Sequence, residues 1–571
     1  MKNIEIAKIF ERIADALEIK GENKFKIIAY RNAAKALSDL TEDISEIYEK
    51  GKLLEIPGIG EGIAKKIEEY LKTGRMKKYE EAVSGIPEGL FELLNIPNLG
   101  PKTIKLAYES LKVENLQQLL EVINNGSLEK LPMMGKKKVE NIKEGIKEYL
   151  EKKGEKRRFP IGVVEKVVEY FVSELKNNKF VENIEVAGSY RRHCETVGDI
   201  DILVVGKEGG KIIEHFTSLP NVSKVLSKGD TKGSIIDNEL NIQIDLRVVD
   251  EKSFGSALQY FTGSKAHNIK LRGIAKDLGY KLSEYGIFKE EEYICGRDEI
   301  EVYEKLGLVF IPPELREDRG EIELALKGKI PSLVQLKDIK GDLHIHSNYS
   351  DGFDDIETIA SYGISLGYEY IGIADHSMSV KYAGGLEEER ILKQIEEIEN
   401  LNKKLKNIKI LKGSEVDILK DGSLDFKDEI LKKLDFVIAA IHQGFKKNVT
   451  ERMIDAMDNP YVKIIAHPTG RLLSGREGYD VNIEKVMEKA SEKNIFLEIN
   501  SYYDRLDLNE INAKMAKEMG IKLIINTDAH NIKMMNDIKY GVYIARRAWL
   551  NKDDIVNTRN LKDFINLLKN G

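Results

Sequence analysis

Two aspartates placed two residues apart, Asp199 and Asp201, stand directly before the apolar run 202–205. Side chains at positions i and i+2 of a β-strand point to the same face, so we expect these carboxylates to converge. A second stretch, 242–248, alternates apolar and polar residues, as a half-buried strand does, and carries Asp245 on its polar face. Three carboxylates on neighbouring strands can hold two divalent ions about 3.5–4 Å apart, the spacing that two-metal phosphoryl transfer requires.

A glycine-serine turn precedes these aspartates and suits a phosphate group. Gly188 and Ser189 allow the backbone to approach a phosphate closely, and Arg191 or Arg192 neutralises its charge. An Asp-x-Asp pair by itself is most often a solvated surface feature of a strand. Its combination with the turn, the arginines and the later Asp245 favours a nucleotidyltransferase site instead.

These residues resemble the polymerase core of the family X DNA polymerases, whose pattern is Gly-Ser-aromatic-Arg-Arg, then Gly-Asp-x-Asp, then a later Asp. A second matching block runs from Tyr260 to Ser264 and is followed by Asn268 and Arg272. In the family this block lines the incoming nucleotide, with the Tyr-Phe pair under the sugar, where it excludes a 2′-hydroxyl. The Tyr-Phe pair could be part of the core and 262–264 a plain turn, but their order and spacing argue against that structural interpretation.

The resemblance implies specific contacts. Asp199, Asp201 and Asp245 would be the catalytic metal ligands, Asn268 would contact the minor-groove side of the base, and Arg272 the templating side. The full nucleotide-binding set that it implies is Arg158, Gly188, Ser189, Arg192, Gly198, Tyr260, Phe261, Gly263, Asn268 and Arg272.

Length and composition frame this interpretation. A chain of 571 residues predicts several domains, and 42% hydrophobic with 32% charged residues is typical of a soluble globular protein. No apolar stretch approaches the roughly 20 residues of a membrane span, and the first residues predict an amphipathic helix rather than a secretion signal. With Cys194 and Cys295 as the only cysteines, no disulfide framework is expected, which favours a reducing cytoplasm.

The net charge of −7 argues at first against a nucleic-acid partner. Its distribution is uneven, because residues 1–160 carry 30 Lys and Arg against 27 Asp and Glu and are the least acidic part. Lysine runs such as 136–138 are more often solvated faces than DNA contacts. The case for DNA binding therefore depends on motifs and not on bulk charge.

Residues 1–155 predict helices throughout, and three segments, 54–60, 94–100 and 131–135, repeat one pattern of a tight turn that opens a helix. A helix N-terminus presents unpaired backbone N–H groups, which suit a DNA phosphate without reading sequence. The segments resemble helix-hairpin-helix motifs, in which backbone carbonyls can also hold a monovalent cation. Their glycines become fewer along the chain, since Asn98 and Met133 replace the first glycine of the second and third copies. The predicted DNA-binding positions are Gly58, Gly60, Asn98, Gly100 and Gly135.

The first hairpin, with the preceding stretch 30–34, resembles the small domain that grips the downstream 5′ end at a DNA gap. Some relatives use a Schiff-base lysine there as a deoxyribose-phosphate lyase, and counting from Gly60 places Lys66 at that position. Nothing in the local sequence marks Lys66 as a lysine of lowered pKa, so an ordinary solvated helix residue is favoured over a nucleophile. Phosphate binding is the expected role of this region.

Six of the nine histidines lie in the C-terminal 231 residues, 341–571, where apolar runs repeatedly end in polar, ligand-type residues. Helical stretches separate these runs, which predicts a parallel barrel whose strand ends gather at one face. A single histidine at a strand end is usually structural. Ligand-type residues at the ends of successive strands indicate a metal site instead. Imidazole and carboxylate groups suit Zn, Mn or Fe, which lower the pKa of bound water.

This pattern, with an opening His-x-His and a closing Asp-x-His, resembles the PHP (polymerase and histidinol phosphatase) family. The resemblance implies a metal-dependent phosphoesterase with about two or three ions of Mn, Zn or Fe. All of the family's ligand positions are filled, namely His344, His346, Asp351, His376, Glu415, His442, His467, Asp528 and His530. Arg471, which follows Thr469 and Gly470, is open to either a phosphate-binding or a structural role.

Together the resemblances predict a multidomain α/β chain in the order found in prokaryotic family X DNA polymerases with a C-terminal PHP domain. The fold class is an α-helical region with helix-hairpin-helix motifs, an α+β palm, and a distorted (β/α)7-like barrel. The expected divisions are a DNA-end-binding domain (1–85), a hairpin domain (86–155), the palm (156–251), a nucleotide-selecting subdomain (252–312), a linker (313–340) and the PHP domain (341–571).

The implied activity is template-directed filling of short DNA gaps in repair, with two Mg or Mn ions, alongside a PHP 3′–5′ exonuclease that could also cleave abasic sites or clean 3′ ends. The expected partners of this chain, a monomer without membrane attachment, are gapped or nicked DNA and dNTPs. Two alternatives stay open: a non-templated nucleotidyltransferase with a PHP small-molecule phosphatase, and a DNA-end-binding scaffold without turnover.

Overall fold

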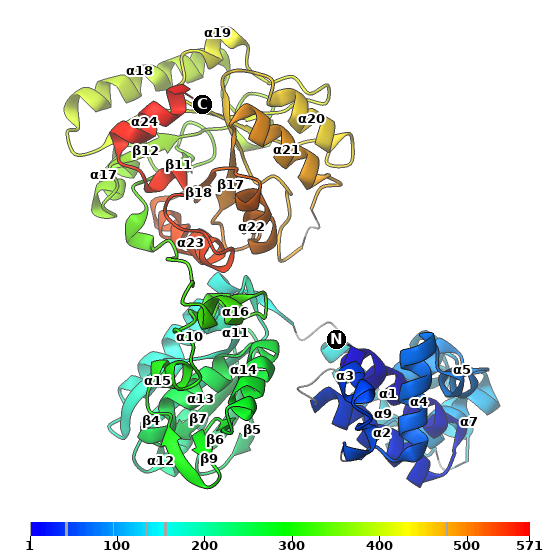
Figure 1. The fold of residues 1–571 in the computed structure, drawn as a ribbon. Helices are drawn as coiled ribbons and strands as arrows, with labels where there is room; N and C mark the ends of the chain where they lie inside the picture. The colour runs from blue at the N-terminus through cyan, green and yellow to red at the C-terminus, as the bar shows by residue number, and fades with distance from the viewer. Residues whose placement is uncertain are drawn as a thin grey trace. The chain divides into compact units, whose positions relative to one another are not determined.

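The computed structural model describes residues 2–39, 44–56, 58–94, 96–132, 134–153, 157–475 and 478–570. The chain divides into two compact units, Met1–Arg157 and Arg158–Gly571, each with its own core (Figure 1). Within the described ranges, no helix has both the length and the apolar content that crossing a bilayer requires.

The first unit is built from helices, as its sequence predicts. They are α1 (Lys2–Lys20), α2 (Lys24–Asp39), α3 (Ile44–Glu49), η1 (Leu53–Glu55), α4 (Glu61–Thr73), α5 (Lys77–Val83), α6 (Glu88–Leu93), α7 (Pro101–Leu111), α8 (Leu116–Asn124), η2 (Leu128–Lys130) and α9 (Lys136–Lys153). One apolar cluster extends from Ile6 of α1 to Tyr149 of α9. Residues 1–85 and 86–155, which the sequence separates, therefore share a single core.

The second unit begins with a five-stranded mixed sheet, the palm. Its elements are β1 (Phe159–Pro160), α10 (Ile161–Lys176), β2 (Val181–Val186), α11 (Gly188–Arg191), β3 (Thr196–Val197), β4 (Asp199–Gly206), α12 (Gly209–Thr217), β5 (Val222–Lys228), β6 (Lys232–Asp237) and β7 (Gln243–Val249). The sheet order is β2-β4-β7-β6-β5, and β4 and β7 are its parallel pair. α10 buries Val164, Val168 and Phe171 in the palm core.

A smaller subdomain, the thumb, follows the palm. It contains η3 (Glu251–Ser253), α13 (Phe254–Thr262), α14 (Lys265–Asp277), β8 (Lys281–Ser283), β9 (Gly286–Lys289), β10 (Glu292–Cys295) and α15 (Glu299–Lys305). β8, β9 and β10 form an antiparallel three-stranded sheet. Leu271, Val302 and Tyr303 lie in its core.

The expected linker, 313–340, is packed against the thumb and includes η4 (Pro313–Leu315), α16 (Glu321–Leu326) and η5 (Leu336–Asp338). Some of its charges are internal: Glu321 lies 2.7 Å from His267, and both side chains are fully buried. Arg316 is likewise fully buried. The charged composition suggests a tether, but its buried charged residues pair with residues of other elements, such as His267 and Glu299.

The C-terminal domain is a barrel of parallel strands surrounded by helices (Figure 1). Its strands are β11 (Gly341–Ile345), β12 (Tyr370–Ile373), β13 (Lys409–Lys412), β14 (Glu415–Asp417), β15 (Val437–Ala440), β16 (Val462–Ile465), β17 (Phe496–Asn500) and β18 (Leu523–Asn526). β13 and β14 are separated by two residues and together occupy one position of the barrel. Parallel bridges His376–Glu415 and Ile345–Ala529 join the two sheets, so the strands close into the predicted seven-position arrangement.

The barrel helices are α17 (Ile356–Ser365), η6 (Lys381–Ala383), α18 (Glu388–Lys404), α19 (Asp428–Leu431), α20 (Val449–Ala456), α21 (Ile483–Lys493), α22 (Glu510–Glu518), η7 (Ile532–Asp537), α23 (Ile538–Arg547), η8 (Val556–Thr558) and α24 (Leu561–Asn570). Palm and barrel residues belong to one continuous apolar core. Their approach is close, because a Cβ on Gly162 of α10 would lie 2.6 Å from Cβ of Tyr503. The palm and the barrel therefore pack as parts of one unit.

A buried ion triad ties the palm to the thumb and generates a stability prediction. Glu299 accepts from Arg191 Nη2 at 2.8 Å and from Arg316 Nη1 at 2.5 Å. Burial raises the pKa of Glu299, but the two guanidinium groups outweigh it and lower the pKa to about 2 from its usual 4.5. Because the folded pKa is depressed, this contribution to stability is fully present above about pH 4.5 and is lost as the pH falls towards 2.

We expect Glu299→Gln to destabilise the thumb by about 3–5 kcal/mol at pH 7, because it leaves the buried Arg316 without a charged partner. Trp549, the single tryptophan, lies in the thumb core, so urea unfolding followed by its fluorescence measures the change. Glu304→Gln, at an exposed position on the same helix, is the matched control. Equal free energies of unfolding for the two variants would contradict the prediction.

Candidate active sites

The three palm carboxylates are brought together by strand pairing. β4 begins at Asp199, and Asp201 stands directly opposite Asp245 in the parallel register of β4 and β7. Neighbouring strands lie about 4.8 Å apart, so the three side chains share one face at one edge of the sheet. Ser234 Oγ and Gln243 Nε2 donate to Asp245 Oδ1 at 2.5 and 3.0 Å and orient that carboxylate.

The predicted phosphate-binding turn lies against these carboxylates. Gly188 has φ +64°, and a Cβ there would lie 2.7 Å from Asp201 Oδ2. Only glycine allows so close an approach, which brings the backbone of the turn to the place where a metal-bound phosphate would lie. This geometry fits divalent ions held by Asp199, Asp201 and Asp245, although these carboxylates do not form a cluster within 4.8 Å among the described residues.

Four further predicted nucleotide contacts lie around the same turn. Arg158 donates to Thr196 Oγ1 at 2.9 Å and to its carbonyl at 2.6 Å, and a Cβ on Gly198 would be 3.1 Å from Arg158 Nη1. Arg192 Nη1 donates to the Thr262 carbonyl at 2.5 Å and would be 3.3 Å from a Cβ on Gly263. The palm turn that contains Ser189 and the thumb turn at Gly263 are therefore adjacent.

The predicted nucleotide contacts on the thumb have mixed environments. Tyr260 and Phe261, at the end of α13, make an edge-to-face pair with ring centroids 5.1 Å apart. Asn268 is buried; its Oδ1 accepts from Gln259 Nε2 and its Nδ2 donates to the Tyr260 carbonyl, both at 2.7 Å. Arg272 is exposed on α14. A contact of Asn268 with a base would thus replace an internal hydrogen bond.

The three hairpin turns share one backbone hydrogen-bond pattern. The N–H groups of Ile59, Leu99 and Met134 donate to carbonyls three residues earlier at 3.0, 3.2 and 3.2 Å. Gly60, Gly100 and Gly135 each accept the first bond of the following helix and have no neighbour within 4 Å of an added Cβ. Gly58 and Asn98 take the left-handed conformation with φ +90° and +64°, and Met133 lies outside the described residues. The third turn thus has the same hydrogen bonds as the first two.

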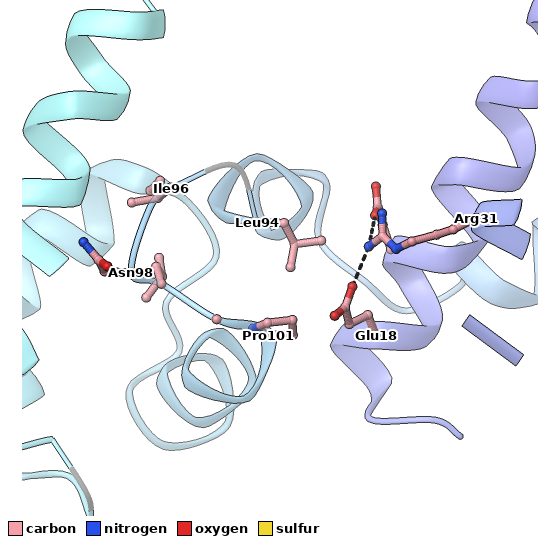
Figure 2. A pocket seen from close by; sticks show the side chains of 9 residues that line it. Glu18, Arg31, Leu94, Ile96, Asn98 and Pro101 are labelled. Carbon is pink, nitrogen blue, oxygen red and sulfur yellow. Dashed lines mark hydrogen bonds and ion pairs between the residues drawn. The ribbon is translucent and has the colours of Figure 1, made fainter. Parts of the chain in front are cut away.

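Figure 2 shows the surroundings of the second turn, a pocket of about 460 Å³ lined by α1, α2 and the residues before α7. Arg31 points into this pocket and is paired with Glu18 at 2.5 Å and Asp15 at 3.1 Å. Because two carboxylates face one guanidinium, the pocket interior does not attract a phosphate. DNA contacts at this motif are therefore expected at the open face of Gly100.

Lys66 has an environment that its local sequence does not reveal. Its Nζ donates to the Gly62 carbonyl at 2.6 Å and lies 5.9 Å from the centre of the Tyr30 ring. Burial, and then the positive charge of Lys78, lower the pKa of Lys66 below its usual range. A lowered pKa is one requirement of a Schiff-base lysine, but the carbonyl contact also suits a structural helix residue.

The barrel gathers the predicted metal ligands from the ends of its strands. Three groups have ligand atoms within 4.8 Å of one another: His346, Asp351, His376 and His530; His344, His346 and Asp528; and His376, Glu415 and His442. His346 and His376 each belong to two groups, so the groups overlap. The remaining predicted ligand, His467, lies 3.0 Å from Glu415.

Glu415 is the centre of this arrangement. Its Oε2 lies 2.8 Å from His376 Nδ1 and 3.5 Å from His344 Nε2, while its Oε1 lies 3.4 Å from His442 Nε2. Ring nitrogens of His344, His346 and His376 are buried without a hydrogen-bond partner among the described residues, as is Glu415 Oε2. Buried, mutually facing imidazoles and carboxylates fit divalent transition-metal ions, and Glu415 would be one of the residues that hold them.

Protonation at this centre is governed by burial and by the neighbouring charges. Burial and the nearby His376 and His530 lower the pKa of His346 to about 3, which leaves its imidazole neutral and able to bind a metal. Burial lowers the pKa of His376, but Glu415 and Asp351 outweigh it and raise the pKa to about 10. The same negative potential would stabilise a metal cation, whose binding then displaces protons.

A second layer of polar residues orients the ligands, and the sequence gives only a weak signal for it. Glu498 Oε1 lies 2.8 Å from His344 Nδ1, and Asn500 Nδ2 donates to Asp528 Oδ2 at 3.1 Å. Both follow the pattern of polar residues at strand ends. Asp417 is the third such residue: its Oδ1 lies 3.4 Å from His442 Nδ1 and accepts from the backbone N–H of His442 at 2.8 Å. Such contacts fix the orientation of metal-binding imidazoles.

The two arginines near this centre have different roles. Arg471, a candidate phosphate ligand from the sequence, pairs with Glu195 of the palm at 2.7 and 3.2 Å and donates to the Leu506 carbonyl. Arg505, which the sequence does not single out, lies 3.7 Å from Asp528. Its Nε and Nη1 are buried without a hydrogen-bond partner among the described residues. Arg505 is therefore the better placed of the two for an anionic ligand.

A mixed palm with three carboxylates, a thumb, and a barrel lined by metal-ligating side chains define a nucleotidyltransferase joined to a metal-dependent phosphoesterase. Family models agree with each part: the DNA polymerase beta palm matches residues 158–264, the DNA polymerase beta thumb 257–317, and the PHP domain 342–502. A helix-hairpin-helix domain matches residues 1–76 and a SAM-like helix-hairpin-helix tandem 90–148.

The curated protein "DNA polymerase/3'-5' exonuclease PolX" of Bacillus subtilis (strain 168) is 40% identical to this chain over 575 aligned residues. The alignment covers 100% of this chain and 100% of that protein. A probable phosphatase of Thermoanaerobacter sp. (strain X514) is 34% identical over 232 residues, 38% of this chain and 89% of that protein. A probable phosphatase of Clostridium novyi (strain NT) is 28% identical over 233 residues, 37% of this chain and 90% of that protein. The chain belongs to the family X DNA polymerases with a C-terminal PHP domain.

The central position of Glu415 generates a prediction about metal content. Glu415→Gln is expected to lower the number of Mn or Zn ions bound per chain by more than one, because this carboxylate faces His344, His376 and His442 together. Asp351→Asn, which alters one group of ligands, should lower it by about one. Elemental analysis after equilibrium dialysis measures both, and equal losses would contradict a central role of Glu415 in metal binding.

Proposed function

We propose that this chain is a template-directed DNA polymerase that fills short gaps during DNA repair, with a PHP domain that acts as a 3′–5′ exonuclease. The observation that carries the proposal is the parallel register of Asp201 and Asp245 beside the Gly188 turn, since it combines two-metal ligands with a phosphate-binding backbone. The full-length similarity to a protein named DNA polymerase/3'-5' exonuclease supports both activities.

In the polymerase site, two Mg or Mn ions would neutralise the triphosphate and activate the primer 3′-hydroxyl. Asp199 and Asp201 would hold the nucleotide, and Asp245 would orient the primer end for in-line attack on the α-phosphate. Ser189, Arg192 and Arg158 would bind the phosphates, while Tyr260 and Phe261 would pack under the sugar. Asn268 and Arg272 would face the base and the templating strand.

In the barrel, Mn, Zn or Fe would supply a hydroxide at neutral pH for cleavage of a phosphodiester. The nine ligands named above would hold these ions, with Glu415 between them. The same centre suits abasic-site cleavage or removal of blocked 3′ ends, because each reaction hydrolyses a phosphate ester of DNA.

The hairpins would hold DNA without reading its sequence. Their open turns at Gly60, Gly100 and Gly135 present helix N-termini to phosphates, and Gly58 and Asn98 shape the turns. Carbonyls in these turns would also suit a monovalent cation. Gapped or nicked DNA and dNTPs are thus the proposed partners of a cytoplasmic monomer. For Lys66 we propose a contact near the 5′ phosphate rather than covalent chemistry.

Arg505 extends the nuclease proposal to a residue outside the metal ligands. Its buried guanidinium lies beside Asp528 and has donors available for a non-bridging phosphate oxygen. We expect Arg505→Ala to raise the KM of single-stranded DNA cleavage about ten-fold or more, since a charge-assisted hydrogen bond contributes about 1.5–3 kcal/mol.

The measurement for Arg505 is steady-state exonuclease kinetics with Mn, with bound metal determined on the same samples. Arg471→Ala is the control, because Arg471 is engaged with the palm. Arg505→Lys should recover little, since an ammonium group cannot reproduce the planar fork. An unchanged KM in Arg505→Ala, at unchanged metal content, would rule out this contact.

The alternative for the two sites is a non-templated nucleotidyltransferase with a small-molecule phosphatase. The relatives named probable phosphatase, which match the barrel alone, favour that view of the PHP domain. The hairpins and the Tyr260–Arg272 block favour the polymerase, and comparison of primer extension with and without a template separates the two. A scaffold without turnover is excluded if either metal-dependent activity is measured.

Separate variants should switch off the two activities independently. On a single-nucleotide-gapped duplex with a labelled primer, Asp245→Ala is expected to reduce extension by at least about a thousand-fold and to preserve primer shortening in Mn. His344→Ala/His346→Ala is expected to do the reverse. If the histidine variant still shortens the primer, the nuclease assignment is wrong; if the unaltered protein extends nothing under template direction, the polymerase assignment is wrong.

A further inference from the structure

The short segment after the phosphate-binding turn, Arg191–Glu195, is held on several sides by distant parts of the chain. Arg191 pairs with Glu299 of the thumb, and Arg192 Nε donates to Glu317 Oε1 at 2.9 Å. His193 stacks on Tyr543 of α23 with ring centroids 3.6 Å apart and an angle of 8° between the planes. Glu195 pairs with Arg471 of the barrel. His193 and Glu195 thus contact residues of the PHP domain directly. Arg192 is connected to that domain through Glu317.

Arg547, the last residue of α23, makes the most direct of these contacts. Its Nη1 donates to the Arg192 carbonyl at 2.8 Å, and its Nη2 donates to Glu317 Oε1 at 3.1 Å. The remaining edge of the guanidinium binds both carboxylate oxygens of Glu510, at 2.9 and 2.7 Å. Its side chain is only 4% exposed. One PHP arginine therefore contacts both the backbone of the turn and the carboxylate that pairs with Arg192.

Glu317 connects Arg547 to nucleotide binding, because it pairs with both Arg547 and Arg192. Glu317 Oε1 receives Arg192 and Arg547 together, and their charges lower the pKa of Glu317 although burial raises it. An incoming triphosphate would compete with Glu317 for Arg192. If Arg192 turns to the phosphate, Glu317 still has Arg547 as a partner and is not left as an unpaired, largely buried charge.

We propose that Arg547 of the PHP domain is a positioning residue for the nucleotide-binding turn of the polymerase. It holds the carbonyl of Arg192 in place and compensates Glu317 when Arg192 contacts the triphosphate. The PHP domain is therefore a structural component of the polymerase's nucleotide site as well as a separate catalytic domain. This inference rests on the proposed polymerase function.

The same interface provides a matched control on the same helix. Lys539 of α23 pairs with Glu165 of α10 at 2.6 Å, an ion pair as short as those of Arg547, but it does not contact the turn. Lys539→Gln weakens the packing of palm on barrel without removing a partner of Arg192 or Glu317. Neither Lys539 nor Arg547 is among the barrel's metal-ligating residues, so exonuclease activity reports whether each variant is folded.

The test combines kinetics with direct binding on full-length protein. Single-nucleotide gap filling gives KM for the template-matched dNTP and kcat, and titration of that dNTP with Ca onto a gapped duplex with a dideoxy-terminated primer gives Kd without chemistry. Arg547→Gln is expected to raise KM and Kd about ten-fold or more, as loss of a hydrogen bond to a charged group does, with kcat changed by less than about two-fold. Lys539→Gln should leave all three unchanged.

Coupling through Glu317 is the most specific expectation. In a Glu317→Gln background no carboxylate remains at position 317 for Arg547 to compensate. Adding Arg547→Gln should therefore change KM by clearly less than it does alone. Arg547→Lys should behave like Arg547→Gln, because one ammonium group cannot reach Glu510, Glu317 and the carbonyl together. Arg547→Lys also serves as the test if Arg547→Gln loses exonuclease activity through misfolding.

Several outcomes would overturn the inference. They are an unchanged Kd for Arg547→Gln and Arg547→Lys, an equal rise for Lys539→Gln, or additive effects with Glu317→Gln. A loss confined to kcat would also contradict a positioning role in nucleotide binding. If the unaltered protein fails to bind the matched dNTP on gapped DNA, the proposed polymerase function fails instead, so the two failures are distinguishable.

Discussion

The pairing of parallel strands is the constraint on which both catalytic sites depend. Backbone hydrogen bonds between β4 and β7 place Asp201 opposite Asp245, and those between the barrel strands bring His344, His376 and Glu415 to one face. Like charges and buried imidazoles repel one another or lose solvation when they are gathered in this way. The strand ladders and the apolar cores beneath them hold these groups together, and metal ions are the natural counter-charge. The same principle therefore produces two metal sites of different chemistry in one chain.

Charge pairing over long sequence separations then fixes the surroundings of the palm site. Arg191, Glu299 and Arg316 form a buried triad, and Arg192, Glu317 and Arg547 form a second network beside it. Such networks are costly to break once buried, because each partner left alone is an unpaired charge in a poorly solvated place. They connect palm, thumb and barrel at the turn that is expected to hold the triphosphate. The nucleotide site is consequently shaped by residues from three parts of the chain.

The helical unit shows how one backbone geometry tolerates different residues. Gly58 and Asn98 both take the left-handed conformation, and all three turns use the same hydrogen bonds before Gly60, Gly100 and Gly135. A glycine count along the sequence suggests that the motif weakens, whereas the hydrogen bonds are retained in the third copy. The apolar core that extends from α1 to α9 includes Ile59, Leu99 and Met134 of these turns. The backbone shape of the turns therefore depends on tertiary contacts as well as on local composition.

The sequence by itself determined the chemistry, because metal ligands and phosphate-binding turns depend on local spacing. Asp199 and Asp201 share β4, and His344 on β11 and His346 just beyond its end are likewise two residues apart. It also predicted the barrel, from apolar runs that end in ligand-type residues. Only the tertiary structure decided that Arg471 binds Glu195 while Arg505 lies beside Asp528, and that the segment 313–340 is packed rather than free. The ionic partners in these networks lie tens or hundreds of residues apart in the sequence, as Arg192 and Glu317 do. No local pattern encodes which charge each one meets, because that choice is made by how the domains pack.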